Sequence, residues 1–574
     1  HTRSIWVTGV QRVLFRSVRA SGTAVILEDI AFPVDKLGDA ILDLHALFAK
    51  HEYRNAIIFG HAKDGNLHFV ITQTFNTPDE VDRYRRFMDD VVELVVQRYD
   101  GALKAEHGTG RNMAPFVETE WGGDAYRIMA RLKKCIDPHN LLNPGVIINE
   151  HKDAHLRNLK MLPAVEQEVD KCIECGYCEH VCPSRDLTLT PRQRIVVRRE
   201  LQMQKARGDK DNFNQLVREY QYYGMDTCAV DGLCATACPV DINTGDLIKR
   251  LRRENHGAFS NRLAVAVAKN FSTTARLVSM ALRTGNTVNK IFGRSAMRKL
   301  TTGIRKIVPA FPLWSNQIIT TNRASLLREQ KKILNAAPAQ HTVVYLPTCI
   351  ARVMGGVKNK QGVAETLMRV AGKARVNVVL PEELSASCCG QIFSSKGFSK
   401  AWSVIANETI AKLWRASAEG EHPVITDISS CTYTLQHCRP MLNAENQLHF
   451  DKLTIIDSID FLHDYVLPAV TIAKKKNNIV LHPVCSLEKM ASKHKMLVIA
   501  KQCAAEVTVP LHAGCCGMAG DRGFLFPELT ASATAREAAE IKGSSCDGYY
   551  SSARTCEMAI WRSEERRVGK ECRS

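Results

Sequence analysis

The stretch Cys172-Ile-Glu-Cys175-Gly-Tyr-Cys178-Glu-His-Val-Cys182-Pro183 brings four cysteines into one short segment. Two residues separate each of the first three cysteines, three separate the last pair, and a proline follows. This spacing lets one loop place three thiolates around an iron–sulfur cube, because soft sulfur ligands hold iron in a tetrahedral field. The stretch therefore predicts an iron–sulfur loop and a role in electron transfer.

A second run, Cys228, Cys234 and Cys238 followed by Pro239, repeats most of this pattern further along the chain. Together the two runs resemble a two-cluster bacterial ferredoxin, in which the fourth cysteine of each run binds the other cluster. This predicts a helical two-[4Fe-4S] domain with two ligand sets. One set is Cys172, Cys175, Cys178 and Cys238, and the other is Cys182, Cys228 and Cys234.

The second ligand set is one thiolate short, because Asp231 occupies the position where the second cysteine of its run would stand. Either this carboxylate binds the fourth iron, or that iron is labile and a [3Fe-4S] cluster forms. Structural zinc is the first alternative for such cysteine pairs, but the following prolines and interlocked runs favour iron. Disulfides are a weaker alternative, because 20 cysteines in a long enzyme-like chain suggest a reducing compartment.

Positive charge is concentrated at residues 249–306, in the middle of the chain. The formal net charge is +17, and from Lys249 to Lys306 the basic residues face a single acid, Glu254. Apolar stretches at 263–267 and 277–282 alternate with these charges and predict amphipathic helices. Such helices suit an anionic membrane surface or an acidic partner protein, with a solvated linker as the alternative; no motif points to nucleic acid. The sequence contains no apolar run long enough to span a membrane, so any membrane contact is expected to be peripheral.

Residues 20–149 read as an α+β domain with polar residues gathered in two places. Short β-rich runs lie at 25–27 and 56–59, and a third strand at 67–69 follows a glycine-containing turn. Apolar residues recur at helical spacing over 81–95. His61 and His68 bracket the glycine turn, and Glu106 with His107 lies in the segment 104–112. Two histidines and a carboxylate make a three-ligand metal site with open positions, although isolated histidines are more often structural.

The segments 60–68, 106–110 and 142–145 together resemble the C-terminal substrate domain of FAD-linked 2-hydroxyacid dehydrogenases, the D-lactate and D-2-hydroxyglutarate group. The resemblance implies a ferredoxin-like α+β fold and a divalent metal such as zinc or manganese bound by His61, His68 and Glu106. It implies that His107 is the catalytic base that takes the hydroxyl proton. Asn143 is expected near the flavin, and Arg111 beside the substrate carboxylate or the flavin.

The same resemblance implies a reaction. The metal is expected to bind the hydroxyl and carboxylate of a D-2-hydroxyacid while hydride passes to FAD. In this family the FAD-binding domain lies upstream of the substrate domain, and no such domain precedes residue 20. The chain is therefore expected to be a fragment that lacks it.

The C-terminal half contains an internal repeat. In each half a cysteine follows an apolar strand and a proline, a Cys-Cys-Gly turn comes next, and a further cysteine comes last. Alternation of strands and helices predicts tandem α/β repeats. The eight cysteines are Cys349, Cys388, Cys389 and Cys431 in the first repeat, and Cys485, Cys515, Cys516 and Cys556 in the second.

This repeat resembles the cysteine-rich domain shared by heterodisulfide reductase, the anaerobic glycerol-3-phosphate dehydrogenase iron–sulfur subunit and glycolate oxidase iron–sulfur subunits. The motif of that domain ends in C-x2-C, whereas Thr434 and Ala559 stand at the last position here. A four-cysteine site in each repeat or a redox-active thiol pair fits this change better than a five-thiolate cluster. Buried structural cysteines are the alternative.

The sequence thus predicts a multidomain α+β protein. The expected parts are a foreign leader (1–17), the substrate domain (18–150), the two-cluster ferredoxin domain (151–258), a basic helical connector (259–338), two cysteine-rich repeats (339–465 and 466–561) and a foreign tail (562–574). The expected function is oxidation of D-lactate to pyruvate, with electrons passed through the clusters to quinone or cytochrome c. Glycolate and D-2-hydroxyglutarate are the rival substrates, and an electron-transfer subunit without its own dehydrogenase activity is the alternative of another class. The expected location is the cytoplasm or the periphery of the inner membrane.

Overall fold

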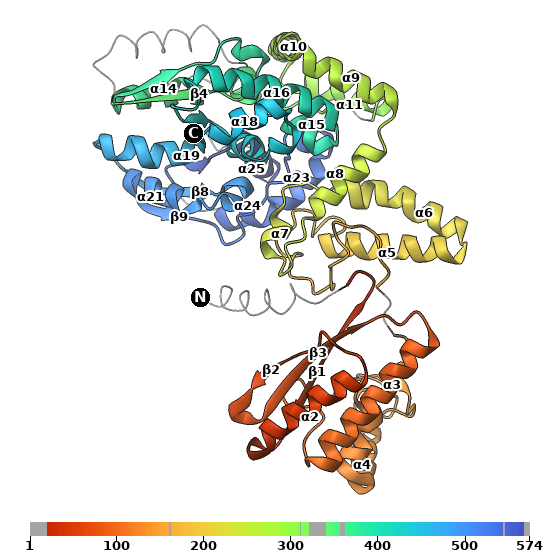
Figure 1. Cartoon of the computed structure of the whole chain (residues 1–574). Helices are drawn as coiled ribbons and strands as arrows, with labels where there is room; N and C mark the ends of the chain where they lie inside the picture. The colour runs from red at the N-terminus through yellow and green to blue at the C-terminus, as the bar shows by residue number, and fades with distance from the viewer. Residues whose placement is uncertain are drawn as a thin grey trace. The chain divides into compact units, whose positions relative to one another are not determined.

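The computed structural model describes residues 20–159, 162–309, 311–318, 320, 340–355, 362–542 and 546–567. It divides into two compact units, residues 1–175 with 195–213, and residues 176–194 with 214–574 (Figure 1). The expected leader, much of the second half of the connector and most of the expected tail lie outside the described residues.

The first unit contains a three-stranded antiparallel sheet in the order β1-β3-β2. Helices cover one face of it, because alternate residues of the central strand, Leu67, Phe69 and Ile71, are buried against apolar side chains of α2 and α3. The α+β prediction and its three strands are confirmed. The elements are β1 (Ala24–Ala31), α2 (Leu37–Lys50), β2 (Ile57–His61), β3 (Asn66–Gln73), α3 (Pro78–Val92) and α4 (Val117–Ile136).

Helix α3 begins where its sequence provides a complete cap. The Thr77 hydroxyl accepts a hydrogen bond from the backbone N–H of Glu80, and the Glu80 carboxylate accepts one from the backbone N–H of Thr77. The apolar face predicted over 81–95 is buried, but the α-helix ends at Val92 and continues as a π-helical segment, Glu93–Arg98. The periodicity thus located the helix but not its change of winding.

The cysteine runs at 172–182 and 228–238 lie mainly in loops among helices, as predicted for a ferredoxin-type domain. The connector is helical too, which confirms its predicted amphipathic helices; Asn270 and Gly293 mark its breaks. Within the described residues no helix is both long and apolar enough to cross a bilayer. The helices are α5 (Pro191–Arg207), α6 (Lys210–Tyr220), α7 (Leu233–Ala237), α8 (Thr244–Glu254), α9 (Ala258–Lys269), α10 (Phe271–Phe292) and α11 (Ala296–Ile307).

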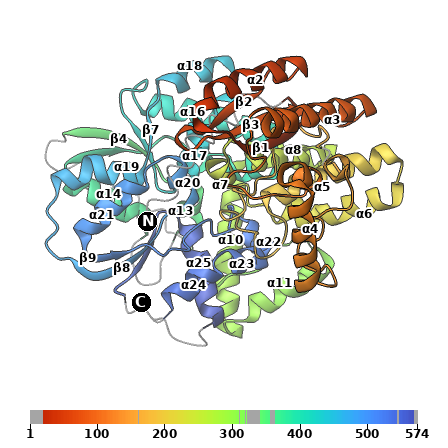
Figure 2. The same cartoon turned by 90° about the horizontal axis from the view of Figure 1, so that it is seen from below.

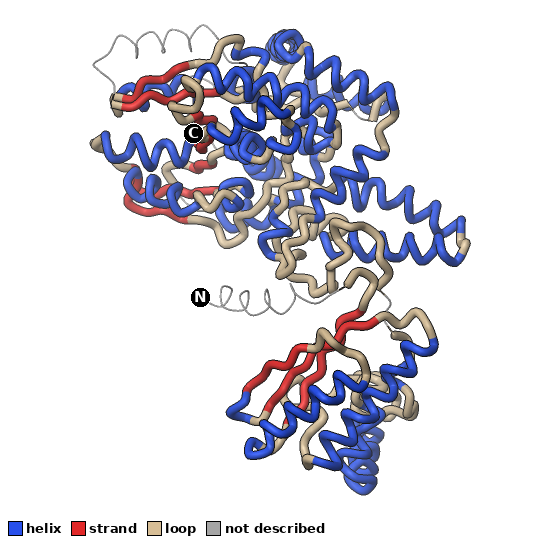
Figure 3. Tube along the Cα trace, in the orientation of Figure 1, coloured by secondary structure: helices blue, strands red, loops and turns tan. Residues whose placement is uncertain are grey.

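The C-terminal half folds as two α/β repeats, each built on a small parallel sheet (Figures 2 and 3). Strand order is β5-β4-β6-β7 in the first repeat and β10-β8-β9 in the second. The first repeat contains β4 (His341–Leu346), α13 (Cys349–Met354), α14 (Val363–Lys373), β5 (Val376–Val379), α15 (Gln391–Lys396), α16 (Ser399–Ala416), β6 (Val424–Thr426), α17 (Ser429–Gln436), α18 (Ala444–Lys452), β7 (Ile455–Asp457) and α19 (Ser458–Phe461). The second contains β8 (Lys476–His482), α20 (Cys485–Lys489), α21 (Lys493–Cys503), β9 (Ala504–Thr508), α22 (Arg522–Leu525), α23 (Pro527–Ala533), α24 (Ala535–Ile541), β10 (Tyr549–Ser551) and α25 (Arg554–Arg567).

The first cysteine of each repeat begins the helix that follows its central strand, Cys349 in α13 after β4 and Cys485 in α20 after β8. The last cysteine lies in the helix after the third strand, Cys431 in α17 and Cys556 in α25. The internal repeat seen in the sequence is therefore a repeat of structure, and the tandem α/β prediction is confirmed.

Candidate active site and cysteine centres

The histidine site lies on the sheet face opposite to the helices. His68 is on the central strand, directly across from Asp29 of β1 and Phe59 of β2. Directly opposed residues point to the same face, and His61, two residues after Phe59, shares it. The pleat and register of three short strands therefore bring His61, His68 and Asp29 together.

Glu106 joins the two histidines from the loop after the sheet. Its Oε1 lies 2.9 Å from His68 Nε2 and 3.3 Å from His61 Nε2. The His68 side chain is 5% exposed, whereas those of His61 and Glu106 are 61% and 49% exposed. One predicted ligand is thus anchored in the sheet while the other two open to solvent, an arrangement that would leave room for a substrate.

His107 lies beside this group. Its ring stacks on His68 with centroids 4.8 Å apart and planes 13° apart, and its Nε2 is 3.7 Å from Glu106 Oε1. The side chain is 46% exposed. It is therefore close to the three predicted ligands and accessible to a bound molecule.

Asp29, which the sequence did not single out, holds the loop that contains Glu106 and His107. It is fully buried, and its Oδ2 accepts hydrogen bonds from the backbone N–H groups of Ala105, Glu106 and His107 at 3.1, 2.9 and 2.8 Å. Asn66 Nδ2 donates to its other oxygen at 2.6 Å. Burial opposes ionisation of Asp29, but these hydrogen bonds outweigh burial and lower its pKa below the ordinary value.

These residues fit a divalent metal. The ligand atoms of His61, His68 and Glu106 all lie within 4.8 Å of one another, as do those of Asp29, His68 and His107. The first set is the better site, because Asp29 already accepts three backbone N–H groups through one oxygen. Imidazole nitrogen with carboxylate oxygen suits zinc or manganese.

The two remaining residues predicted for this site lie in different surroundings. Arg111 is exposed, and its Nη2 donates to the backbone carbonyl of Arg157 at 3.0 Å. Asn143 is exposed in a turn, where its φ is +45° and its carbonyl accepts from the N–H of Val146 at 3.2 Å. No contact joins either side chain to the three ligands among the described residues, so their roles stay predictions.

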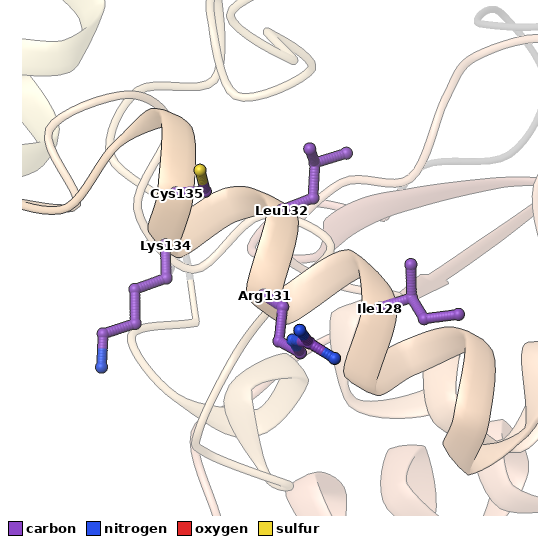
Figure 4. Close-up of a pocket in the computed structure, with 5 residues that line it drawn as sticks. All are labelled: Ile128, Arg131, Leu132, Lys134 and Cys135. Atoms are coloured by element: carbon purple, nitrogen blue, oxygen red, sulfur yellow. The ribbon is translucent and has the colours of Figure 1, made fainter.

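A hollow of about 630 Å³ lies elsewhere in the first unit, on helix α4. Ile128 and Leu132, one turn apart, project from the same side of this helix, near Arg131, Lys134 and Cys135 (Figure 4). None of the predicted ligands lines this hollow.

In the first cysteine-rich repeat the four predicted cysteines come together. Cys388 Sγ lies 3.9 Å from Cys349 Sγ, and the thiol of Cys389 forms hydrogen bonds with those of Cys388 and Cys431. The hydrogen bond from Cys388, followed by burial, raises the pKa of Cys349 well above the ordinary value. A buried group of neutral thiols of this kind becomes a set of thiolates only beside a cation.

The second repeat has the same arrangement. Cys516 Sγ lies 3.1 Å from Cys556 Sγ, and Cys485 and Cys515 are joined by a hydrogen bond. At the position of the missing last cysteine, Thr434 donates to the carbonyl of Ser430 at 2.8 Å and Ala559 is fully buried. Neither provides a fifth sulfur.

The dicluster loops place Cys182, Cys228 and Cys234 in the protein interior. Asp231 Oδ1 accepts a hydrogen bond from the backbone N–H of Leu233 at 2.7 Å. Its negative charge opposes the ionisation of the thiols of Cys234, Cys485 and Cys515. This carboxylate therefore lies between the second ligand set and the second repeat. Of the first set, Cys172, Cys178 and Cys238 are half-buried and Cys175 is exposed.

None of the 19 described cysteines forms a disulfide, so the disulfide alternative has no support among these residues. The thiols of each repeat instead gather into the group of four cysteines singled out in the sequence.

Three parts of the chain match known families. Residues 6–147 match the C-terminal domain of FAD linked oxidases, residues 168–242 a 4Fe-4S dicluster domain, and residues 343–436 the cysteine-rich domain. The chain thus contains matches to the three kinds of domain that the sequence resemblances implied.

Several curated proteins are similar to parts of the chain. D-2-hydroxyglutarate dehydrogenase of Escherichia coli is 25% identical over 371 residues, 55% of this chain and 36% of that protein. Glycolate oxidase subunit GlcD of Bacillus subtilis is 30% identical over 26% of this chain and 31% of that protein. D-lactate dehydrogenase of Anaerostipes hadrus is 28% identical over 24% of this chain and 29% of that protein. The matched regions thus span about a third of each relative.

Proposed function

We propose that this chain takes part in FAD- and iron–sulfur-dependent oxidation of a D-2-hydroxyacid, with D-lactate as the leading substrate and quinone or cytochrome c as the acceptor. The observation that carries the proposal is the open His61, His68 and Glu106 group with His107 stacked beside it. The rest of the chain supports the electron-transfer part of the proposal, because it contains matches to a dicluster domain and a cysteine-rich domain.

Each residue of the site has a distinct task. His61, His68 and Glu106 hold the divalent metal, which when bound polarises the substrate hydroxyl and carboxylate. His107 accepts the hydroxyl proton at its exposed ring, and Asp29 fixes the loop that positions this ring. Arg111 meets the substrate carboxylate or the flavin, and the exposed Asn143 turn faces the flavin. FAD, which takes the hydride, would be held with an FAD-binding domain on the same or another polypeptide.

Changing His107 to glutamine tests the base. We expect kcat for D-lactate to fall about 10²–10⁴-fold, because a positioned general base contributes that much, while metal content stays at the wild-type level. Steady-state kinetics of the chain together with its FAD-binding domain, paired with metal analysis, measures both. Wild-type kcat in the H107Q protein would exclude His107 as the base.

D-2-hydroxyglutarate is the second candidate substrate. The similarity to the E. coli D-2-hydroxyglutarate dehydrogenase covers 55% of this chain, against 24% for the D-lactate dehydrogenase of A. hadrus. Glycolate is a third candidate through the GlcD subunit. The ratio of kcat/KM values for the three acids decides among them.

For the acceptor side, we propose that helices α9, α10 and α11 form a peripheral membrane surface. On α10, Arg276, Arg283 and Lys290 recur every seven residues, so they share one exposed line. Beside it lie the exposed apolar side chains of Leu277 and Ile291. Helices α9 and α11 repeat this pairing with Arg262 and Lys269 beside Phe259 and Leu263, and with Lys299 and Lys306 beside Leu300 and Ile307.

Basic residues that flank exposed apolar ones are typical of helices that lie in the interface of an anionic membrane. We expect the protein to sediment with vesicles containing anionic phosphatidylglycerol and to release from them at high salt. Replacing Leu277 and Ile291 by glutamine should reduce binding at least tenfold, whereas the same change at exposed Leu448 of α18 should not. Equal binding to neutral phosphatidylcholine vesicles, or none to either kind, would contradict a membrane surface and favour an acidic protein partner.

A further inference from the structure

Three buried arginines from distant parts of the chain surround the loop that ends at Cys228. Arg194 lies in the first turn of α5, Arg252 in α8 and Arg522 in α22, and their exposures are 1%, 6% and 8%. All three guanidinium groups interact electrostatically with Cys228. Buried arginines are uncommon because desolvation of a charge is costly. Three of them around one loop therefore call for an explanation.

Arg194 makes direct contact with a predicted iron ligand. Its Nη1 donates to Cys182 Sγ at 3.7 Å, Nη2 donates to Ser184 Oγ at 2.9 Å, and Nε donates to the carbonyl of Gly224 at 2.7 Å. All three nitrogens of the guanidinium are therefore engaged, and one of them points at sulfur.

Arg252 and Arg522 bind the backbone of the same loop. Arg252 Nη2 donates to the carbonyl of Cys228 at 2.8 Å, and its Nη1 donates to the carbonyl of Ser395 in α15 at 2.6 Å. Arg522 Nη1 donates to the carbonyl of Asp226 and lies 3.7 Å from its carboxylate. Two arginine side chains thus connect the loop at Asp226 and Cys228 to α15 of the first repeat and α22 of the second.

Most of the positive charge around this loop is held by uncharged acceptors. Arg194 and Arg252 donate to sulfur, hydroxyl and carbonyl groups. The carboxylates nearby are Asp226, beside Arg522, Asp231 of the same loop, and Asp521, which pairs with Lys396 at 2.7 Å. A thiolate-bound cluster would bring further negative charge to the two arginines.

We propose that Arg194, Arg252 and Arg522 are positioning residues that raise the reduction potential of the cluster bound by Cys182, Cys228 and Cys234. A cluster held by thiolates is anionic and gains negative charge on reduction, so nearby buried cations stabilise the reduced form more than the oxidised form. This cluster would lie next to the cysteine centre of the second repeat, because Ala229 and Leu233 pack against Cys485 and Cys515. The proposal rests on the iron–sulfur part of the proposed function and not on its substrate.

The test is a potentiometric titration of anaerobically purified full chain followed by EPR, with chemical mediators and no hydroxyacid. The signal lost in the Cys234→Ser protein identifies the second cluster. In the Arg252→Gln and Arg522→Gln proteins we expect the midpoint of that signal alone to fall by about 59 mV or more, a tenfold change in the one-electron equilibrium. Arg252→Lys keeps the charge and should keep most of the potential.

The matched control is Arg253→Gln, the same change at the exposed neighbour on α8. A midpoint unchanged in both buried variants while both clusters are present would overturn the proposal and leave the proposed function intact. Iron-free wild-type protein would overturn both. If Arg252→Gln and Arg522→Gln fail to fold, an unchanged midpoint in the Arg194→Gln protein, which removes the charge beside Cys182, would equally overturn it.

Discussion

Replacing His68 with alanine is expected to remove the divalent metal from this chain and to abolish hydroxyacid turnover. His68 is the buried member of the three-ligand group, and its Nε2 lies 2.9 Å from Glu106 Oε1. Loss of a partner outside the ligand shell already costs about 10–100-fold in metal affinity, so loss of a ligand should cost at least about 100-fold. Calorimetric titration with Zn²⁺ and Mn²⁺ measures the affinity, and elemental analysis gives the metal content as purified.

His45 provides the matched control, because it is exposed on α2 of the same unit. His45→Ala should keep wild-type affinity, and Glu106→Gln, which removes a charge but little volume, should weaken binding in the same direction as His68→Ala. A His68→Ala protein that retains one metal per chain at wild-type affinity would show that the metal is bound elsewhere.

Replacing Asp29 with alanine should have the second largest effect, although Asp29 is not one of the three preferred ligands. The change leaves three backbone N–H groups without their acceptor and should lower the free energy of unfolding by about 3 kcal/mol. Glu106 and His107 would lose their fixed position, so turnover should fall more than metal affinity. Chemical denaturation and kinetics measure the two effects, and exposed Asp35→Ala serves as the control.

The same residue predicts a dependence on pH. The pKa of Asp29 is lower in the folded protein than in the unfolded chain, so the unfolded chain binds more protons at acidic pH. The stabilisation by Asp29 is therefore fully present above the unfolded pKa and is lost as pH falls through the folded value. Wild-type and Asp29→Asn proteins should approach equal stability as pH falls below the folded pKa of Asp29. A difference between them that stays constant throughout an acid titration would contradict the role of its charge.

The sequence located the ligand histidines but not the residue that organises them. His61 and His68 stand out because they bracket a glycine turn, whereas Asp29 lies in an ordinary strand far from them in sequence. Only the register of β1 against β3 places Asp29 opposite His68. A polar residue at a core-like strand position was the available signal, and it becomes interpretable once the strand pairing is known.

The cysteine centres were predictable for the opposite reason. The Cys-Cys-Gly turn and the strand and proline before the first cysteine recur with matching flanks, so the repeat appears directly in the sequence. The structure then brings Cys388 and Cys349, 39 residues apart, within 3.9 Å. The buried arginines were not predictable. Arg194, Arg252 and Arg522 are far apart in a chain rich in basic residues, and no sequence pattern distinguishes them from exposed arginines. Burial is decided by packing among distant segments, which charge patterns do not encode.

The most direct test of the central claim is low-temperature EPR of the anaerobic chain together with its FAD-binding domain, before and after adding D-lactate, with glycolate and D-2-hydroxyglutarate in parallel. The proposed function predicts reduced-cluster signals within the time of a few turnovers with D-lactate, and the same signals with dithionite. Reduction by one of the other two acids alone would keep the chemistry and change the substrate. Signals with dithionite but with none of the three acids would contradict the account and make the chain an electron carrier for another donor.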